Sequence, residues 1–116
     1  MTAIAPPLTT QPRPALTFAT EWLNPSLVRI TVAGDVDASN ASRLADYVFR
    51  RAANCRRLIL DLEGVAFFGT AGFTTLRTID IRCERACVTW TLVSSPAVRR
   101  VLDICDPRHT LPVAAA

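Results

Sequence analysis

A strand-like segment that leads through a glycine-rich loop into a helix-like segment constrains this chain more than any other feature. Residues 57–62 are typical of a strand, residues 67–74 read Phe-Phe-Gly-Thr-Ala-Gly-Phe-Thr, and helical periodicity follows to about residue 86. The loop places Thr70 at the predicted N-cap of that helix. A helix N-terminus favours a phosphate, because its first N–H groups are unpaired and carry partial positive charge. Since no catalytic base lies nearby in sequence, the loop predicts a surface for docking and modification rather than for chemistry.

The rest of the chain alternates between strand and helix signals. A helix is expected after Ser39, its candidate N-cap, and another starts at Ser95-Pro96, where proline follows the cap. Strands are expected at 15–19, 27–33 and 88–93, with a short one near 111–113. Each helix has one apolar face and must lie on a sheet. The sequence therefore predicts an α/β fold: a mixed sheet of four or five strands, with three helices packed mainly on one face.

Composition and charge exclude several classes of protein. The chain has 116 residues, half of them hydrophobic, and a net charge of +3. Its 13 lysine and arginine residues are all arginines, six of them in three scattered pairs, so no basic stripe predicts nucleic-acid binding. No segment has the length and apolarity of a membrane span or secretory signal, which predicts a cytoplasmic protein. We expect a proline-rich disordered leader at 1–14, one domain at 15–113 and a tail at 114–116.

Four cysteines and one histidine give no metal-binding pattern, so neither a metal site nor a cofactor is predicted. Cys83, Cys87 and Cys105 fall on apolar helix stripes, which indicates core positions. The alternative is a redox pair between Cys87 and Cys105, if their helices lie side by side. Cys55, followed by two arginines, is expected to be the most exposed thiol, with a stabilised thiolate.

Four segments together resemble a known family. Residues 34–37 look like its Gly-x-Leu-Asp segment, residues 58–68 like its central strand, and residues 94–102 like the start of its last helix. Residues 69–72 (Gly-Thr-Ala-Gly) stand where the family has an Asp-Ser-x-Gly phosphorylation loop. In this order and spacing, the motifs resemble those of the STAS domain, as in bacterial anti-sigma factor antagonists, over about residues 15–113.

The resemblance implies a partner switch in transcription regulation, and not an enzyme. Members of the family bind an anti-sigma factor of the GHKL kinase type and thereby free a sigma factor. The same partner phosphorylates the loop with ATP, and a phosphatase of the PP2C type reverses this. Carried over, Thr70 is the acceptor. Separately, we expect the protein to be a monomer or a weak dimer. The contact residues would be Asp35, Asp37, Phe68, Gly69, Thr70, Ala71, Gly72 and Phe73.

One departure from the family pattern leaves the function open. Gly69 stands in place of the usual Asp before the acceptor, which predicts weaker phosphorylation, a different kinase or a permanently active switch. The alternative is a STAS regulatory subunit of a lipid ABC transporter, which docks without phosphorylation. A third interpretation is a ligand-sensing STAS domain, although the sequence marks no pocket.

Overall fold

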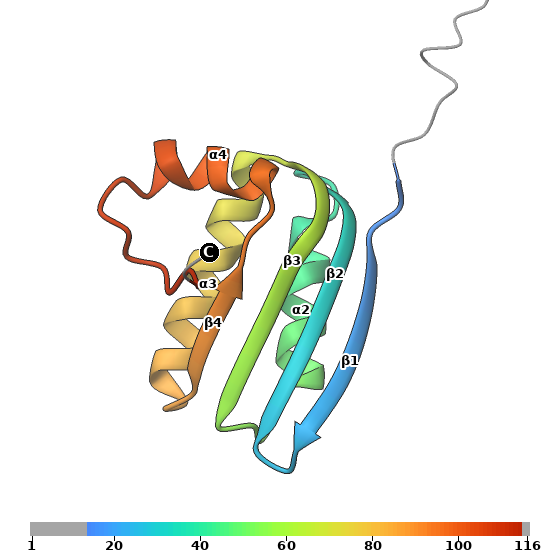
Figure 1. Cartoon of the computed structure of the whole chain (residues 1–116), viewed down its shortest axis with the longest axis vertical. Coiled ribbons are helices and arrows are strands. Elements are labelled where there is room, and N and C mark those ends of the chain that lie inside the picture. The colour runs from blue at the N-terminus through green and yellow to red at the C-terminus, as the bar shows by residue number, and fades with distance from the viewer. Residues whose placement is uncertain (1–13, 115–116) are drawn as a thin grey trace, which may run out of the picture.

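The computed structural model describes residues 14–114, which form one sheet of four strands and three helices (Figure 1). Except for Pro14 and Ala114, the predicted leader and tail lie outside the described residues. The strands are β1 (Thr17–Asn24), β2 (Leu27–Val36), β3 (Arg57–Phe68) and β4 (Thr89–Val93). The helices are α2 (Ala41–Arg51), α3 (Thr70–Arg85) and α4 (Pro96–Cys105).

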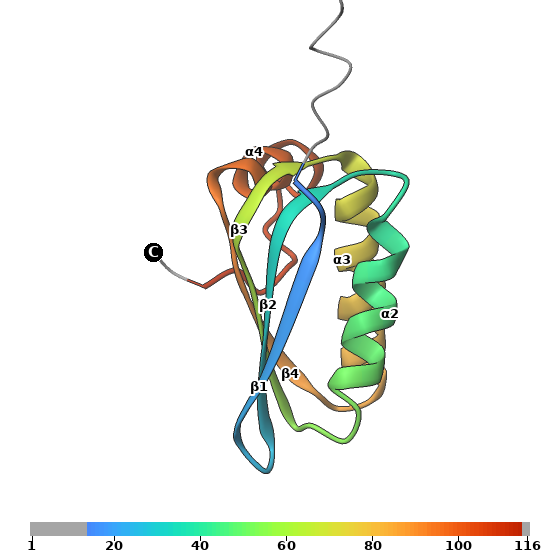
Figure 2. The same ribbon diagram turned by 90° about the vertical axis from the view of Figure 1, so that its right-hand side faces the viewer.

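The sheet is mixed, with strand order β1-β2-β3-β4. The hairpin strand β1 pairs antiparallel with β2, whereas β2, β3 and β4 are parallel. A single bridge from Val113 to Leu92 adds the short final segment beside β4. Helices α2 and α3 cover one face of the sheet, and α4 lies across its end (Figures 1 and 2). The predicted fold class is confirmed.

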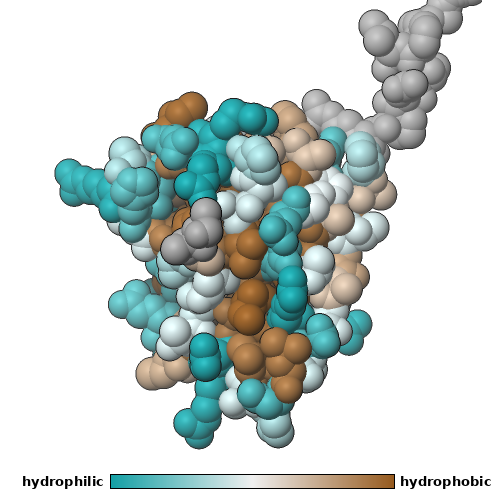
Figure 3. All heavy atoms as spheres, in the orientation of Figure 1, coloured by the Kyte–Doolittle hydropathy of each residue, from teal (hydrophilic) through white to brown (hydrophobic). Residues whose placement is uncertain are grey.

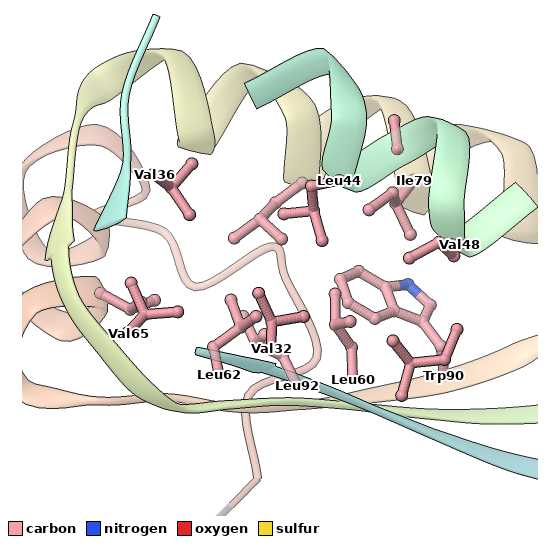
Figure 4. Packing of buried hydrophobic residues seen from close by; sticks show 14 of the residues in the cluster. Val32, Val36, Leu44, Val48, Leu60, Leu62, Val65, Ile79, Trp90 and Leu92 are labelled. Carbon is pink, nitrogen blue, oxygen red and sulfur yellow. The ribbon is translucent and has the colours of Figure 1, made fainter. Parts of the chain in front are cut away.

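The core forms where the alternating strands meet the two covering helices. Leu58, Leu60 and Leu62 on β3 point to this side and are at most 1% exposed. Figure 4 shows such residues packed between the sheet and the apolar faces of α2 and α3, including Leu44 and Ile79. Burying a large aliphatic side chain fully contributes about 1.5–3 kcal/mol. The opposite sheet face is not covered by α2 or α3 and is mixed in polarity (Figures 2 and 3).

The second strand continues beyond its predicted end at residue 33. Glycine at position 34 indicated a break, but β2 runs on to Val36 and stays paired with β3 through an irregular register. Gly34 has φ +104°, and a Cβ there would lie 2.2 Å from the carbonyl oxygen of Ala15. Glycine thus allows both the backbone conformation and the close approach of a second chain segment. The extra pairing aligns the end of β2 with that of β3.

The helix starts follow their predictions in one case and depart from them in another. Ser95 caps α4, its hydroxyl accepting a hydrogen bond from the N–H of Val98 at 3.2 Å, with Pro96 next, as predicted. Ser39 is not the cap of α2, which begins at Ala41. Its N–H and hydroxyl instead donate to the Asp37 carboxylate. The aspartate forms a local turn before the helix, which competes with capping by Ser39.

Candidate docking surface at the strand ends

The candidate site lies where parallel strands β2 and β3 end. Residues 37–40 connect β2 to α2, and Gly69 connects β3 to α3. The N–H of Gly69 donates to the carbonyl oxygen of Val36 at 2.8 Å and joins the two connections. Both lie at the end of the molecule that α4 also occupies (Figure 1). We call residues 67–73, which include the predicted acceptor Thr70, the acceptor loop.

Thr70 is exposed and is the first residue of α3, rather than its N-cap as predicted. The cap is Gly69, whose backbone is extended (φ −83°, ψ 171°), so the helix begins without a side-chain cap. Within residues 14–114, the Thr70 hydroxyl has no hydrogen-bond partner. It is therefore presented to solvent at the positive end of the helix dipole.

Gly69 has room for a side chain. A Cβ at this position would lie 3.6 Å from the Phe67 ring and from the Val36 carbonyl oxygen, and 3.8 Å from the Cα of Asp37. These are ordinary contact distances, and φ is negative, so the backbone does not require glycine. The missing carboxylate is a chemical difference and not a steric necessity.

Phe68 and Gly72 lie beneath the loop and support it. The side chain of Phe68 is 4% exposed, and Gly72 is buried. A Cβ on Gly72 would lie 2.5 Å from two atoms of the Phe68 ring, so the ring packs directly against the helix backbone. In this structure the two buried residues support the loop from beneath, although the sequence analysis placed them among the expected contact residues.

The two aspartates differ in accessibility. Asp35 is buried at 6% exposure within β2, and its backbone carbonyl accepts a hydrogen bond from the Asn40 side chain at 2.9 Å. Asp37 is half-buried in the connection to α2, next to the acceptor loop. Of the pair, Asp37 is the one with a surface that a partner can reach.

Aromatic residues lie three positions before and three positions after Thr70 in the chain. Phe67 is 41% exposed and was not among the predicted contact residues, although strand alternation places only one of two adjacent phenylalanines in the core. Phe73 is half-buried, with the guanidinium carbon of Arg77 5.8 Å from its ring centroid. Ala71 is also half-buried. An exposed aromatic beside a hydroxyl and small residues is suited to a protein partner.

The cysteines depart from two predictions. Cys55 is buried, not exposed, and burial raises the pKa of its thiol, which disfavours the expected thiolate. Cys87 lies just beyond α3 with φ 59° and is exposed, because the helix ends at Arg85 rather than continuing its apolar stripe. Cys105, the last residue of α4, is half-buried. Both members of the proposed redox pair are free thiols here.

The described residues contain neither a metal-binding cluster nor a membrane-spanning helix. Within residues 14–114, no cluster of three or more His, Cys, Asp or Glu side chains is arranged to hold a metal ion. Among the helices in that range, none has the length and apolarity needed to cross a membrane.

The fold and this surface define a small α/β domain whose strand ends present a hydroxyl-bearing loop. The model of the STAS domain family matches residues 23–115. The chain belongs to the STAS domain family, as its motifs predicted.

Curated relatives come from Mycobacterium tuberculosis. Osmosensory protein A is 36% identical over 69 residues, or 60% of this chain, and the chain spans only 44% of the length of that relative. Anti-sigma-F factor antagonist RsfA is 34% identical over 92 residues, which cover 76% of this chain and 72% of RsfA.

Solved structures share the fold. An anti-sigma factor antagonist from Mycobacterium paratuberculosis aligns with a TM-score of 0.76 and 22% identity, over 88% of this chain and 87% of that one. The anti-sigma factor antagonist SpoIIAA in its unphosphorylated form aligns with a TM-score of 0.68 and 17% identity, over 85% of this chain and 89% of that one.

Proposed function

We propose that this protein is an anti-sigma factor antagonist, a binding module and not an enzyme. It binds an anti-sigma factor of the GHKL kinase type through the acceptor loop and Asp37, and so releases a sigma factor. The observation that carries the proposal is the exposed Thr70 hydroxyl at the start of α3, between small residues and beside exposed Phe67. The 34% identity to RsfA, named as an anti-sigma-F factor antagonist, supports it.

Phosphorylation of Thr70 turns the module off in this proposal, and a PP2C-type phosphatase restores it. A phosphate adds a charge of about −1.5 to −2 at pH 7. The N-terminus of α3 accommodates that charge within the free domain. In a docked interface, the dianion must lose its water and face the partner's surface, which disfavours binding.

The direct test is recovery of the partner from lysate in the presence of ATP and Mg²⁺, followed by intact mass and phosphosite mapping. Recovery of a GHKL-type kinase, with phosphate on Thr70, is the expected result. With that purified partner, Thr70→Glu should weaken binding at least tenfold, whereas Thr70→Ala should preserve it. Thr74→Glu is the matched control, because Thr74 is exposed one turn further along α3. Equal affinity of Thr70→Glu and the wild type would refute the switch.

Gly69→Asp tests the missing carboxylate. The site accommodates the side chain, and Asp is a good N-cap, so the variant should fold at least as stably as the wild type. We expect faster phosphorylation of Thr70 by the recovered kinase. If the wild type binds the kinase without being phosphorylated and Gly69→Asp is phosphorylated, the natural protein is a constitutive antagonist.

The alternative function is regulation of a lipid ABC transporter by docking alone. Gly69 favours this alternative, because the chain lacks the carboxylate that precedes the acceptor in family members that act as switches. Recovery of permease and ATPase subunits, with no kinase, would support this alternative and overturn the antagonist proposal.

A further inference from the structure

We propose that a pocket between the C-terminal ends of α2 and α3 binds a small organic anion with an apolar body, of the medium-chain carboxylate class. These helix ends lie at the opposite end of the molecule from the acceptor loop (Figures 1 and 2). The site is independent of the proposed docking function. The structure thus provides the pocket that the sequence did not mark.

The pocket has the size of a small ligand. Its volume is about 300 Å³, at the lower end of the range for ligand sites. At about 30 Å³ for each water-sized group, this space holds roughly ten non-hydrogen atoms. Its lining residues are Val48, Phe49, Ala52, Ala53, Asn54, Cys55, Leu58, Arg82, Cys83, Ala86 and Val88. The alanines leave the space open, because their side chains are short.

The inner wall is apolar and neutral. Leu58 and Val48 are at most 2% exposed, and the residues Cys55 and Cys83 are each 7% exposed. Burial raises the pKa of both thiols, that of Cys83 to about 11, so both remain protonated at neutral pH. The inner wall therefore favours a hydrocarbon group over a polar one.

Arg82 is the one cationic residue among those that line the pocket. The guanidinium carbon of Arg82 lies 4.1 Å from the centroid of the Phe49 ring, and Arg82 is exposed. Among residues 14–114, the guanidinium has no hydrogen-bond or ion-pair partner. Stacking on the ring leaves its N–H groups available to bind a carboxylate through two parallel hydrogen bonds. A cation beside an apolar wall matches a ligand with an anionic head and a hydrocarbon tail. The partial negative charge at the two helix C-termini opposes an anion here, but it is weaker than a bidentate pair with Arg82.

Octanoate, with about ten non-hydrogen atoms, is the probe that fits this volume. Titration of the full chain, followed by ¹H–¹⁵N NMR, should give saturable shifts at the amides of Ala52, Ala53 and Cys83. Arg82→Gln should weaken octanoate binding about tenfold or more, while barely changing the weaker binding of neutral 1-octanol. Arg77→Gln is the matched control, because Arg77 lies on the same helix and also stacks on a phenylalanine, but outside the pocket.

Octanoate binding can also be tested on the wild-type protein, without any substitution. Saturating octanoate should slow the modification of Cys55 and Cys83 by a thiol reagent, and leave exposed Cys87 unaffected. Ala86→Leu, which fills the pocket from its wall, should abolish the saturable shifts. Absence of both saturation and thiol protection would overturn the proposal. So would equal effects of Arg82→Gln and Arg77→Gln on octanoate affinity, because the cation would then have no role.

Discussion

Gly72 and Phe68 are in closer contact than any side chain at position 72 allows. A Cβ there would lie 2.5 Å from two ring atoms of Phe68 and 3.0 Å from a third. The ring is rigid and only 4% exposed, so it has little room to move. Gly72→Ala must therefore displace the ring or the start of α3, although alanine is the better helix former.

Overpacking against Phe68 destabilises the variant, whereas the higher helix propensity of alanine stabilises it. Their magnitudes decide whether the free energy of unfolding falls or rises. Overpacking of a filled core costs about 1–3 kcal/mol. Replacing glycine by alanine in a helix returns at most about 1 kcal/mol. We therefore expect Gly72→Ala to lower the free energy of unfolding by about 1–2 kcal/mol, and the melting temperature by about 4 °C for each kcal/mol.

Urea unfolding followed by circular dichroism measures this loss, and Gly69→Ser is the matched control. At position 69 the added Cβ meets nothing closer than 3.6 Å, and serine is a good N-cap, so stability should be unchanged or slightly higher. In the Gly72→Ala background, Phe68→Leu should recover part of the loss, giving a favourable coupling energy of about 1 kcal/mol. Unchanged stability of Gly72→Ala, or strict additivity in this cycle, would refute the packing argument.

Two further predictions concern α4 and the segment after it. Ser95→Ala removes the hydrogen bond to the Val98 N–H and should cost about 1 kcal/mol in urea unfolding, whereas Ser95→Asp should retain most of the stability. Burial opposes ionisation of Asp106, but hydrogen bonds from Thr110 and Leu111 outweigh it and lower the pKa of this carboxyl. Its contribution to stability is therefore complete above about pH 4 and lost as pH falls through the lowered pKa. Asp106→Asn should be less stable than wild type at pH 7, and the difference should shrink below about pH 4. A difference independent of pH would contradict this account.

Local signals predicted the elements whose causes are local. Ser95 and Pro96 start α4 because the cap and the fixed proline backbone act within one turn of the helix. The strand-like composition of residues 57–62 predicted a strand there, and β3 begins at Arg57 as expected. Loop composition likewise predicted that Thr70 is accessible at the start of a helix, although its capping role was wrong by one residue.

Structural features that depend on contacts between distant segments could not be predicted from the sequence. Residues 34–36 remain in β2 because β3 supplies their pairing partners from 31 or 32 residues further along the chain. Cys55 is buried despite two following arginines, because α2, α3 and the start of β3 converge around it. Burial of Phe68 beneath Gly72 also arises from the close approach of α3 to the end of β3.

The sequence by itself therefore determined the order of strands and helices, the family and the position of the hydroxyl loop. These follow from periodicity, capping and motif spacing, which act over a few residues. Only the tertiary structure decided which residues of the acceptor loop reach solvent. Phe67 is exposed, whereas Phe68 is buried. The tertiary structure alone formed the pocket beside Arg82, because the walls of a cavity come from segments that meet only when the chain is packed.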